Sequence, residues 1–328
     1  MNAHNLVMIK IYMNKRILVL GSNGQLGRSL LKVVREIANL VNTNNQFYNF
    51  GEDLLLSEKD FLFISRKEFD LLNLRSMSEF IQDQQFTAIV NCAAYTLVEK
   101  AETHENLADQ INYIAVAKLA EIAKDKDLPL IHISTDYVFH GQDEKPYLET
   151  DKTNPQNIYG LSKLKGEKAI KLSGCKGVII RTSWLYSEFG NNFVKTILRL
   201  GKEKDKISVI MDQFGSPTYA TNLAKLIFVI LNNQKKMNIL NSQSNIYHYS
   251  DEGICSWYEF AKSIFLFSKI SCEIKPIQTK DYPFKTKRPP YSVMNTEKIK
   301  KNIPKLKIPK WPESLKNCLK EIKKQSCS

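Results

Sequence analysis

The 328-residue sequence contains no long apolar run. Because no stretch approaches the roughly 18 residues of a membrane-spanning helix, we expect no membrane partner. The first residues, MNAHNLVMIKIYMNKR, mix short apolar patches with polar residues and contain no small-residue cleavage site, so we expect no signal peptide. Met13 stands just before the first predicted strand, and we treat residues 1–12 as an N-terminal extension.

Paired cysteines are also lacking. The six cysteines form no C-x-x-C pair and no Cys/His spacing of the kind that binds zinc. The sequence therefore predicts a reduced, cytoplasmic protein without a structural metal.

Acidic residues are scarce in only one part of the chain. The formal net charge is +13, yet residues 275–328 hold 15 Lys and Arg against 4 Asp and Glu, which leaves +2 for the rest. The tail from residue 298 has Lys but no Arg, and Trp311 is its only aromatic residue. This favours a solvated surface over a nucleic-acid site.

Apolar runs of strand length alternate with helical patterns in the first half. The predicted strands are 16–20, 87–91, 130–134 and 177–182, with a helix from Gln25 to about residue 40. Alternating strands and helices predict an α/β fold: a Rossmann-type doubly wound parallel sheet with a smaller C-terminal α/β substrate domain. We expect the Rossmann domain over 13–185, with an insertion at 41–59. Residues 186–328 would be mainly the substrate-binding domain, part of it returning to the Rossmann domain.

A glycine-rich segment, GSNGQLG, follows the first predicted strand and opens the first helix. Glycines let the backbone approach a pyrophosphate, and the helix N-terminus offers free N–H donors. We therefore expect cofactor contacts here, from Gly21, Asn23, Gly24, Gln25, Leu26 and Gly27.

The end of the next strand bears on the choice of cofactor. An NAD site commonly has a carboxylate there to bind the ribose 2′-hydroxyl, whereas this chain has Ser65, Arg66 and Lys67. A hydroxyl with two cations favours NADPH over NADH, although NADH stays an alternative. Ala93 and Ala94 follow a further strand and are small enough to let a cofactor lie against the backbone.

Tyr159 and Lys163 stand four residues apart in YGLSK, and therefore share a helix face. A nearby ammonium favours the phenolate, so we expect Lys163 to lower the pKa of Tyr159 toward the range useful for acid-base catalysis. Thr135, at the end of an earlier strand, is expected to supply a hydroxyl to the substrate carbonyl group on which Tyr159 would act.

These motifs together resemble the extended short-chain dehydrogenase/reductase family, and within it the branch that reduces dTDP-linked 4-keto sugars. The resemblance runs from about Met13 to Met294, and its motifs stand in family order: GSNGQLG, NCAAYTLVEKAE, STDYVFHG, PQNIYGLSKLKGEKA, RTSWLY, GNNFVKT, DQFGSPT and RPPYSVMNT. Several motifs in order are more specific than a Rossmann domain alone.

The resemblance implies a role for individual residues. Tyr159 would be the proton donor, and Lys163 would hold the nicotinamide ribose. Further cofactor contacts would come from Asp70, Leu71, Ala94, Tyr95 and Thr96. Substrate contacts would come from Thr135, Asp136, Tyr137 and Trp184, with Arg288 a candidate for the nucleotide diphosphate and Trp184 alternatively a core aromatic.

The resemblance also narrows the reaction. Related dehydratases carry an acidic residue where this chain has Tyr137, and epimerases commonly lack an equivalent of Asp136, so simple reduction is favoured. The implied reaction is reduction by NADPH of the C4 keto group of dTDP-4-dehydro-L-rhamnose. Another nucleotide-linked 4-keto sugar stays an alternative, as does a non-catalytic relative like the regulatory subunit of methionine adenosyltransferase.

The resemblance leaves the oligomeric state open, with a homodimer as one alternative. Some relatives bind Mg²⁺ at a dimer contact through acidic residues, one of them shortly after the glycine loop. Here Arg28 and Ser29 follow Gly27, so we do not expect a metal-bridged dimer.

Overall fold

The computed structural model describes residues 16–41, 56–82, 84–233, 239–243, 245–283, 286–303 and 306–327. The predicted extension 1–12 lies outside these ranges, as do residues 42–55 of the predicted insertion.

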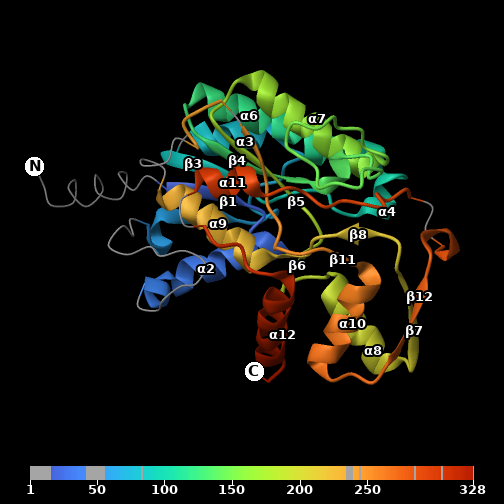
Figure 1. Cartoon of the computed structure of the whole chain (residues 1–328). Coiled ribbons are helices and arrows are strands. Elements are labelled where there is room, and N and C mark those ends of the chain that lie inside the picture. The colour runs from blue at the N-terminus through green and yellow to red at the C-terminus, as the bar shows by residue number, and fades with distance from the viewer. Residues whose placement is uncertain are drawn as a thin grey trace, which may run out of the picture.

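A six-stranded parallel sheet forms the centre of the molecule (Figure 1). Its order is β10-β5-β4-β3-β1-β2. The strands are β1 (Arg16–Leu20), β2 (Phe61–Ile64), β3 (Phe86–Asn91), β4 (Leu130–Thr135), β5 (Gly177–Thr182) and β10 (Asn245–His248). The predicted strands therefore match the observed ones to within one residue.

Helices cover both faces of this sheet. Ile17 and Val19 of β1 pack into one hydrophobic cluster with α2 (Gln25–Val41) and α9 (Ala220–Asn232), while Leu18 and Leu20 belong to a second cluster on the other face. Alternate strand residues point to opposite faces, so a strand that is apolar throughout must be buried on both sides. The predicted doubly wound α/β fold is confirmed.

The helical elements of the second face follow one another along the chain. They are α3 (Leu74–Gln82), α4 (Val98–Ala101), α5 (Glu105–Asp109), the π-helix η3 (Gln110–Ile114), α6 (Ala115–Asp125) and α7 (Ile158–Ser173). The short helices η2 (Glu58–Asp60) and η4 (Asp136–Val138) adjoin β2 and β4.

The C-terminal half contributes to two places. In Figure 1, α9 lies beside α2 under the sheet. Helix α11 (Glu297–Asn302) contacts β10. A separate cluster gathers α8 (Phe193–Glu203), α10 (Trp257–Ser268) and α12 (Trp311–Cys327) around β7 (Lys206–Ile210), which pairs in parallel with β12 (Glu273–Ile277).

Short paired strands and one further helix complete the described elements. They are β6 (Leu185–Tyr186) with β9 (Thr218–Tyr219), β8 (Phe214–Gly215) with β11 (Cys255–Ser256), and η5 (Thr279–Asp281).

The strand order reverses at β1, which lies between β2 and β3. In open parallel sheets the crevice outside the carboxyl ends of the strands at such a reversal is the usual ligand site. The segments after β1, β3, β4 and β5 are therefore brought to one edge of the sheet.

Candidate active site

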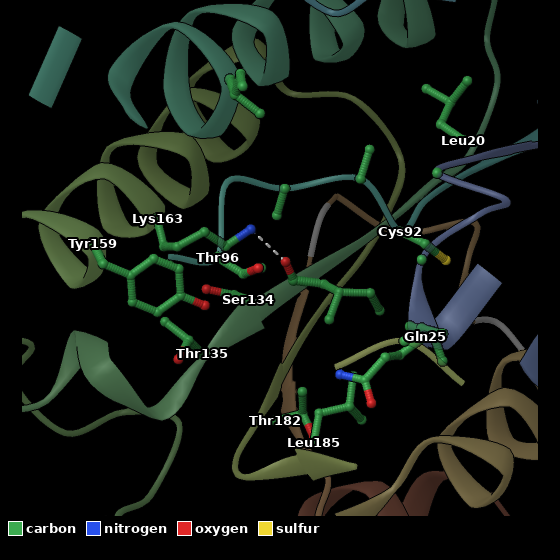
Figure 2. A pocket seen from close by; sticks show the side chains of 18 of the residues that line it. Leu20, Gln25, Cys92, Thr96, Ser134, Thr135, Tyr159, Lys163, Thr182 and Leu185 are labelled. Carbon is green, nitrogen blue, oxygen red and sulfur yellow. Dashed lines mark hydrogen bonds between the residues drawn. The ribbon is translucent and has the colours of Figure 1, made fainter. Parts of the chain in front are cut away.

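A cavity of about 1040 Å³ opens at this edge (Figure 2). Figure 2 shows Tyr159 and Lys163 of α7 facing Ser134 and Thr135, with Gln25 and Leu185 across the cavity from them. The predicted site residues that line it are Gly21, Asn23, Gly24, Gln25, Leu26, Arg66, Asp70, Leu71, Ala93, Ala94, Thr96, Thr135, Asp136, Tyr137, Tyr159, Lys163 and Trp184. Gly27, Ser65, Tyr95 and Arg288 are not among the residues that line it.

The loop after β1 depends on glycine at two positions. Gly21 has φ +78°, and a Cβ there would lie 2.8 Å from the backbone nitrogen of Ala93. A Cβ on Gly27 would lie 2.3 Å from the carbonyl oxygen of Gly21. The glycines thus bring the loop, the β3 end and the N-terminus of α2 together, and this leaves a backbone cradle suited to a pyrophosphate.

The segment after β3 is fixed by buried amides. The Ala93 N–H donates to Asn91 Oδ1 at 3.1 Å. The backbone of Tyr95 is bonded twice to Asn112 of η3, since its N–H donates to Oδ1 at 2.9 Å and its carbonyl accepts from Nδ2 at 3.0 Å. Tyr95 is buried in a separate cluster with Ala101 and Ala108, which explains why its neighbours line the cavity and it does not.

The turn after β2 places cations at the cavity. Arg66 and Lys67 line it, and Arg66 Nε lies 3.7 Å from Asp70 Oδ1. Ser65 has a different role, because its hydroxyl donates to Glu68 Oε2 at 2.8 Å and so closes the turn.

The start and the packing of helix α7 determine the position of Tyr159. Asn157 caps the helix, its Oδ1 accepting from the Gly160 N–H at 2.8 Å. A Cβ on Gly160 would lie 2.2 Å from the carbonyl oxygen of Tyr137, and one on Gly166 would lie 2.2 Å from that of Asn112. These glycines allow α7 to pack closely on η4 and η3, which sets the depth of Tyr159 and Lys163 in the cavity.

The environments of Tyr159 and Lys163 differ from the prediction. Lys163 Nζ donates to the carbonyl oxygen of Ile133 at 2.6 Å, the bond drawn dashed in Figure 2, and also lies 3.2 Å from His132 Nε2. Burial raises the pKa of Tyr159 to about 12, opposed by hydrogen bonding to Thr135, and Lys163 is not among the causes. The expected lowering of this pKa is therefore not found, because desolvation dominates.

The end of β4 carries a chain of polar groups. Thr135 donates to Asp136 Oδ1 at 3.0 Å, and burial raises the pKa of Asp136 to about 6. On the inner side, Ser134 donates to Glu167 Oε1 at 2.5 Å, and Glu167 also forms a buried ion pair with Arg181 at 2.7 Å. Because Glu167 and Arg181 pair with each other, the cost of burying these two charges is offset.

Two predicted substrate residues come from distant segments. Trp184, after β5, lines the cavity in the left-handed backbone region at φ 47°. Arg288 instead lies outside the cavity wall, where its Nη2 donates to Glu99 Oε1 at 2.8 Å.

Sequence reasoning missed the wall contributed by residues 190–192 and, apart from Trp184, the segment after β5. Ser187 and the Nδ2 of Asn192 both donate to Gln25 Oε1 at 2.9 Å, which ties this segment to the N-terminus of α2. The GNNF motif was the available signal for residues 190–192. The residues after β5 could have been found from the rule that ligands bind at the carboxyl ends of parallel strands. The missed lining residues include Cys92, Ser134, Thr182, Ser183, Leu185, Gly190 and Asn191.

A glycine cradle at the first strand, a Tyr–Lys pair on a helix and a hydroxyl at the end of β4 share one cavity in a doubly wound sheet. Together they define the class of extended short-chain dehydrogenases/reductases. Within that class the match is specific: the model of the RmlD substrate binding domain family matches residues 15–324, and the chain belongs to this family.

Two relatives and a solved structure agree with this placement. The chain is 35% identical to the dTDP-4-dehydrorhamnose reductase of Salmonella typhimurium, covering 93% of this chain and 97% of the relative. It is 34% identical to the spore coat polysaccharide biosynthesis protein SpsK of Bacillus subtilis, with the same coverage of both chains. The crystal structure of the Bacillus anthracis dTDP-4-dehydrorhamnose reductase in complex with NADP is 36% identical, with a TM-score of 0.79 over 94% of this chain and all of that one.

Within the described ranges, no helix is both long enough and apolar enough to span a bilayer.

Proposed function

We propose that this protein is a dTDP-4-dehydrorhamnose reductase, which reduces the C4 keto group of dTDP-4-dehydro-L-rhamnose with NADPH. The observation that carries the proposal is the convergence of the glycine cradle, Tyr159, Lys163 and Thr135 on one cavity. The relatives that share the family and nearly the whole chain support the choice of substrate.

The residues present fit the dinucleotide. The Gly21 and Gly24 backbone would receive the pyrophosphate, while Arg66 and Lys67 would face the 2′-phosphate. Ala93, Ala94 and Thr96 line the cavity after β3 and would lie against its middle. When bound, NADPH supplies the hydride, and the protein's task is to align it with the carbonyl.

Tyr159 is suited to donate the proton. Its raised pKa keeps the phenol protonated at neutral pH, so a proton is available for the alkoxide that develops at C4. Thr135 lines the same wall and would hydrogen-bond that oxygen. Lys163 would reach the nicotinamide ribose from the same helix face.

The sugar nucleotide would enter between the two parts of the chain. We assign Asp136, Tyr137 and Trp184 to its binding, because all three line the same cavity as Tyr159. Arg288 would have to exchange its Glu99 partner to reach a diphosphate. We assign residues 13–185 to the cofactor domain and 186–328 mainly to the substrate domain, with α9 and β10 returning to the sheet.

We also propose that the reaction completes the synthesis of dTDP-L-rhamnose for cell-surface polysaccharide. The resemblance to a spore coat polysaccharide biosynthesis protein supports this placement.

The test is a panel of dTDP-, UDP- and GDP-linked 4-keto sugars, assayed by oxidation of NADPH and of NADH. We expect the highest kcat/KM with dTDP-4-dehydro-L-rhamnose and NADPH. Preference for another nucleotide sugar would reassign the substrate, and no turnover with any of them would overturn the proposal.

A further inference from the structure

Three buried side chains form a row behind the cavity. Of the three, only Lys163 has a role in the proposed reaction. Asn91 at the end of β3, His132 in the middle of β4 and Lys163 on α7 are each at most 2% exposed. Asn91 Nδ2 lies 3.2 Å from His132 Nδ1, and His132 Nε2 lies 3.2 Å from Lys163 Nζ.

The orientation of the Asn91 amide is set by the backbone. The Ala93 N–H is a donor and lies 3.1 Å from Asn91 Oδ1, so this position must be the amide oxygen. The amide NH₂ therefore faces His132, and Nδ1 of the imidazole must accept its hydrogen bond.

The tautomer of His132 follows from this. A neutral imidazole has one donor and one acceptor nitrogen, so if Nδ1 accepts, Nε2 carries the proton. Burial holds the pKa of His132 well below its ordinary value, which keeps the ring neutral. The Nε2–H thus points at Lys163 Nζ, and only an unprotonated amine can accept it.

The alternative arrangement, in which a Lys163 ammonium donates to His132, leaves two donors facing each other in either orientation of the Asn91 amide. A Lys163 ammonium could donate to Nε2 only if the ring proton moved to Nδ1, where it would meet the Asn91 NH₂. Turning the amide to relieve that contact would place NH₂ against the Ala93 N–H. A buried donor without an acceptor is costly, so the row favours the amine form.

We propose that His132 is a positioning residue, oriented by Asn91, whose Nε2–H binds the Lys163 amine and couples protonation of this lysine to the imidazole tautomer. The ammonium form would then require His132 to change tautomer or to lose the contact. The consequence for turnover rests on the proposed function, whereas the coupling itself does not.

Other groups around Lys163 also affect its pKa. Glu167, one turn further along α7, favours the ammonium, while burial lowers the pKa of Lys163 to about 8. Glu167 is itself neutralised by Arg181 of β5. The remaining titratable groups that line the cavity are Tyr159, Tyr137, Asp136 and Cys92, together with Arg66, Lys67 and Asp70 after β2.

The direct test is the tautomer in the intact protein. In protein labelled with ¹⁵N-histidine, the imidazole nitrogen shifts distinguish a protonated from a bare nitrogen, and the His132 signals are assigned by their loss in His132→Leu. At about pH 9, above the Lys163 pKa of about 8, we expect Nε2 protonated and Nδ1 bare. A proton on Nδ1 at that pH would overturn the proposal.

The variant His132→Leu gives opposite predictions for the two arrangements. If His132 donates to the amine, its removal raises the Lys163 pKa, by roughly one pH unit. If His132 instead accepts from the ammonium, its removal lowers that pKa. The readout is the pH titration of the lysine ε-carbon in ¹³C-labelled protein, with Lys163 assigned by its loss in Lys163→Met.

A matched control is His248→Leu, which removes another buried neutral histidine whose ring lies 3.4 Å from Arg181 rather than near Lys163. We expect it to leave the Lys163 titration unchanged, and a shift equal to that of His132→Leu would contradict the specific role. If the panel of 4-keto sugars gives no turnover, the proposed function fails while these spectra still decide the coupling. If turnover is found, its pH profile should move with the lysine titration.

Discussion

The indole of Trp184 lies flat against that of Trp257, with ring centroids 3.5 Å apart and planes 7° apart. Trp257 begins α10, whereas Trp184 follows β5 and lines the cavity. A Cβ on Gly215 would lie 2.5 Å from Trp184 Cε2, so the ring is held from a second direction. The left-handed backbone at Trp184 is uncommon for a bulky residue and costs energy that this packing must offset.

Replacing Trp257 by Ala should loosen Trp184 without touching the cofactor cradle. Stacking of this kind contributes about 0.5–1.5 kcal/mol, so we expect the KM for the sugar nucleotide to rise roughly three- to tenfold. NADPH affinity, measured by fluorescence titration, should change little. Trp257→Phe retains an aromatic partner and serves as the control; an equal loss in both variants would contradict the stacking role.

Tyr159→Phe should remove the proton donor and leave the fold intact. General acid catalysis typically contributes about 10²–10⁴-fold, and we expect kcat to fall by that amount with NADPH affinity nearly unchanged. Tyr113→Phe, at a partly exposed tyrosine of η3, is the control. Wild-type turnover by Tyr159→Phe would show that Tyr159 is not the proton donor.

Arg66→Ala should lower activity with NADPH much more than activity with NADH. Arg66 lines the cavity after β2, so loss of its side chain should lower kcat/KM with NADPH by roughly 10- to 100-fold, by removing a charged hydrogen bond of about 1.5–3 kcal/mol. Activity with NADH should stay within about twofold. Arg75→Ala, on the exposed face of α3, removes the same charge elsewhere. Equal losses with both cofactors would show that Arg66 does not contact a 2′-phosphate.

Asp251 should give the protein a measurable pH dependence of stability. Its carboxylate accepts from the Tyr219 N–H and from Asn222, both at 3.1 Å, yet burial raises its pKa to about 7. A raised pKa means that the native state binds the proton more tightly than the unfolded chain does. This contribution is fully present below about pH 4 and is lost as the pH rises to about 7.

Asp251→Asn removes this titration. The difference in free energy of unfolding, wild type minus variant, should fall between about pH 4 and pH 7 by an amount on the order of 4 kcal/mol. Urea unfolding at several pH values measures it. A difference that stays constant with pH would contradict the raised pKa.

Much of the fold could be predicted because its signals are local. The strand 177–182 is a short β-branched run bounded by turn residues, and its observed bounds are identical. The Gly21 loop and the Tyr159–Lys163 spacing are also local, since a turn conformation and a helix face depend on neighbours in sequence. These features carried the prediction of the fold and of most of the cavity wall.

Other parts of the site depend on partners far along the chain. The bond of Arg288 to Glu99 joins residues 189 positions apart, and Gln25 meets Asn192 over 167 positions. The pKa of Tyr159 was predicted with the wrong sign because the spacing of Lys163 could be read from the helix, whereas the burial of the phenol could not.

By itself, the sequence determined the doubly wound sheet, the glycine cradle and the helix that carries Tyr159 and Lys163, since each follows from periodicity or local backbone sterics. Only the tertiary structure decided which polar atoms meet behind the cavity: Lys163 with Ile133 and His132, and Asn91 with His132. Burial then set the proton affinities, because the cost of a charge depends on the solvent that packing excludes.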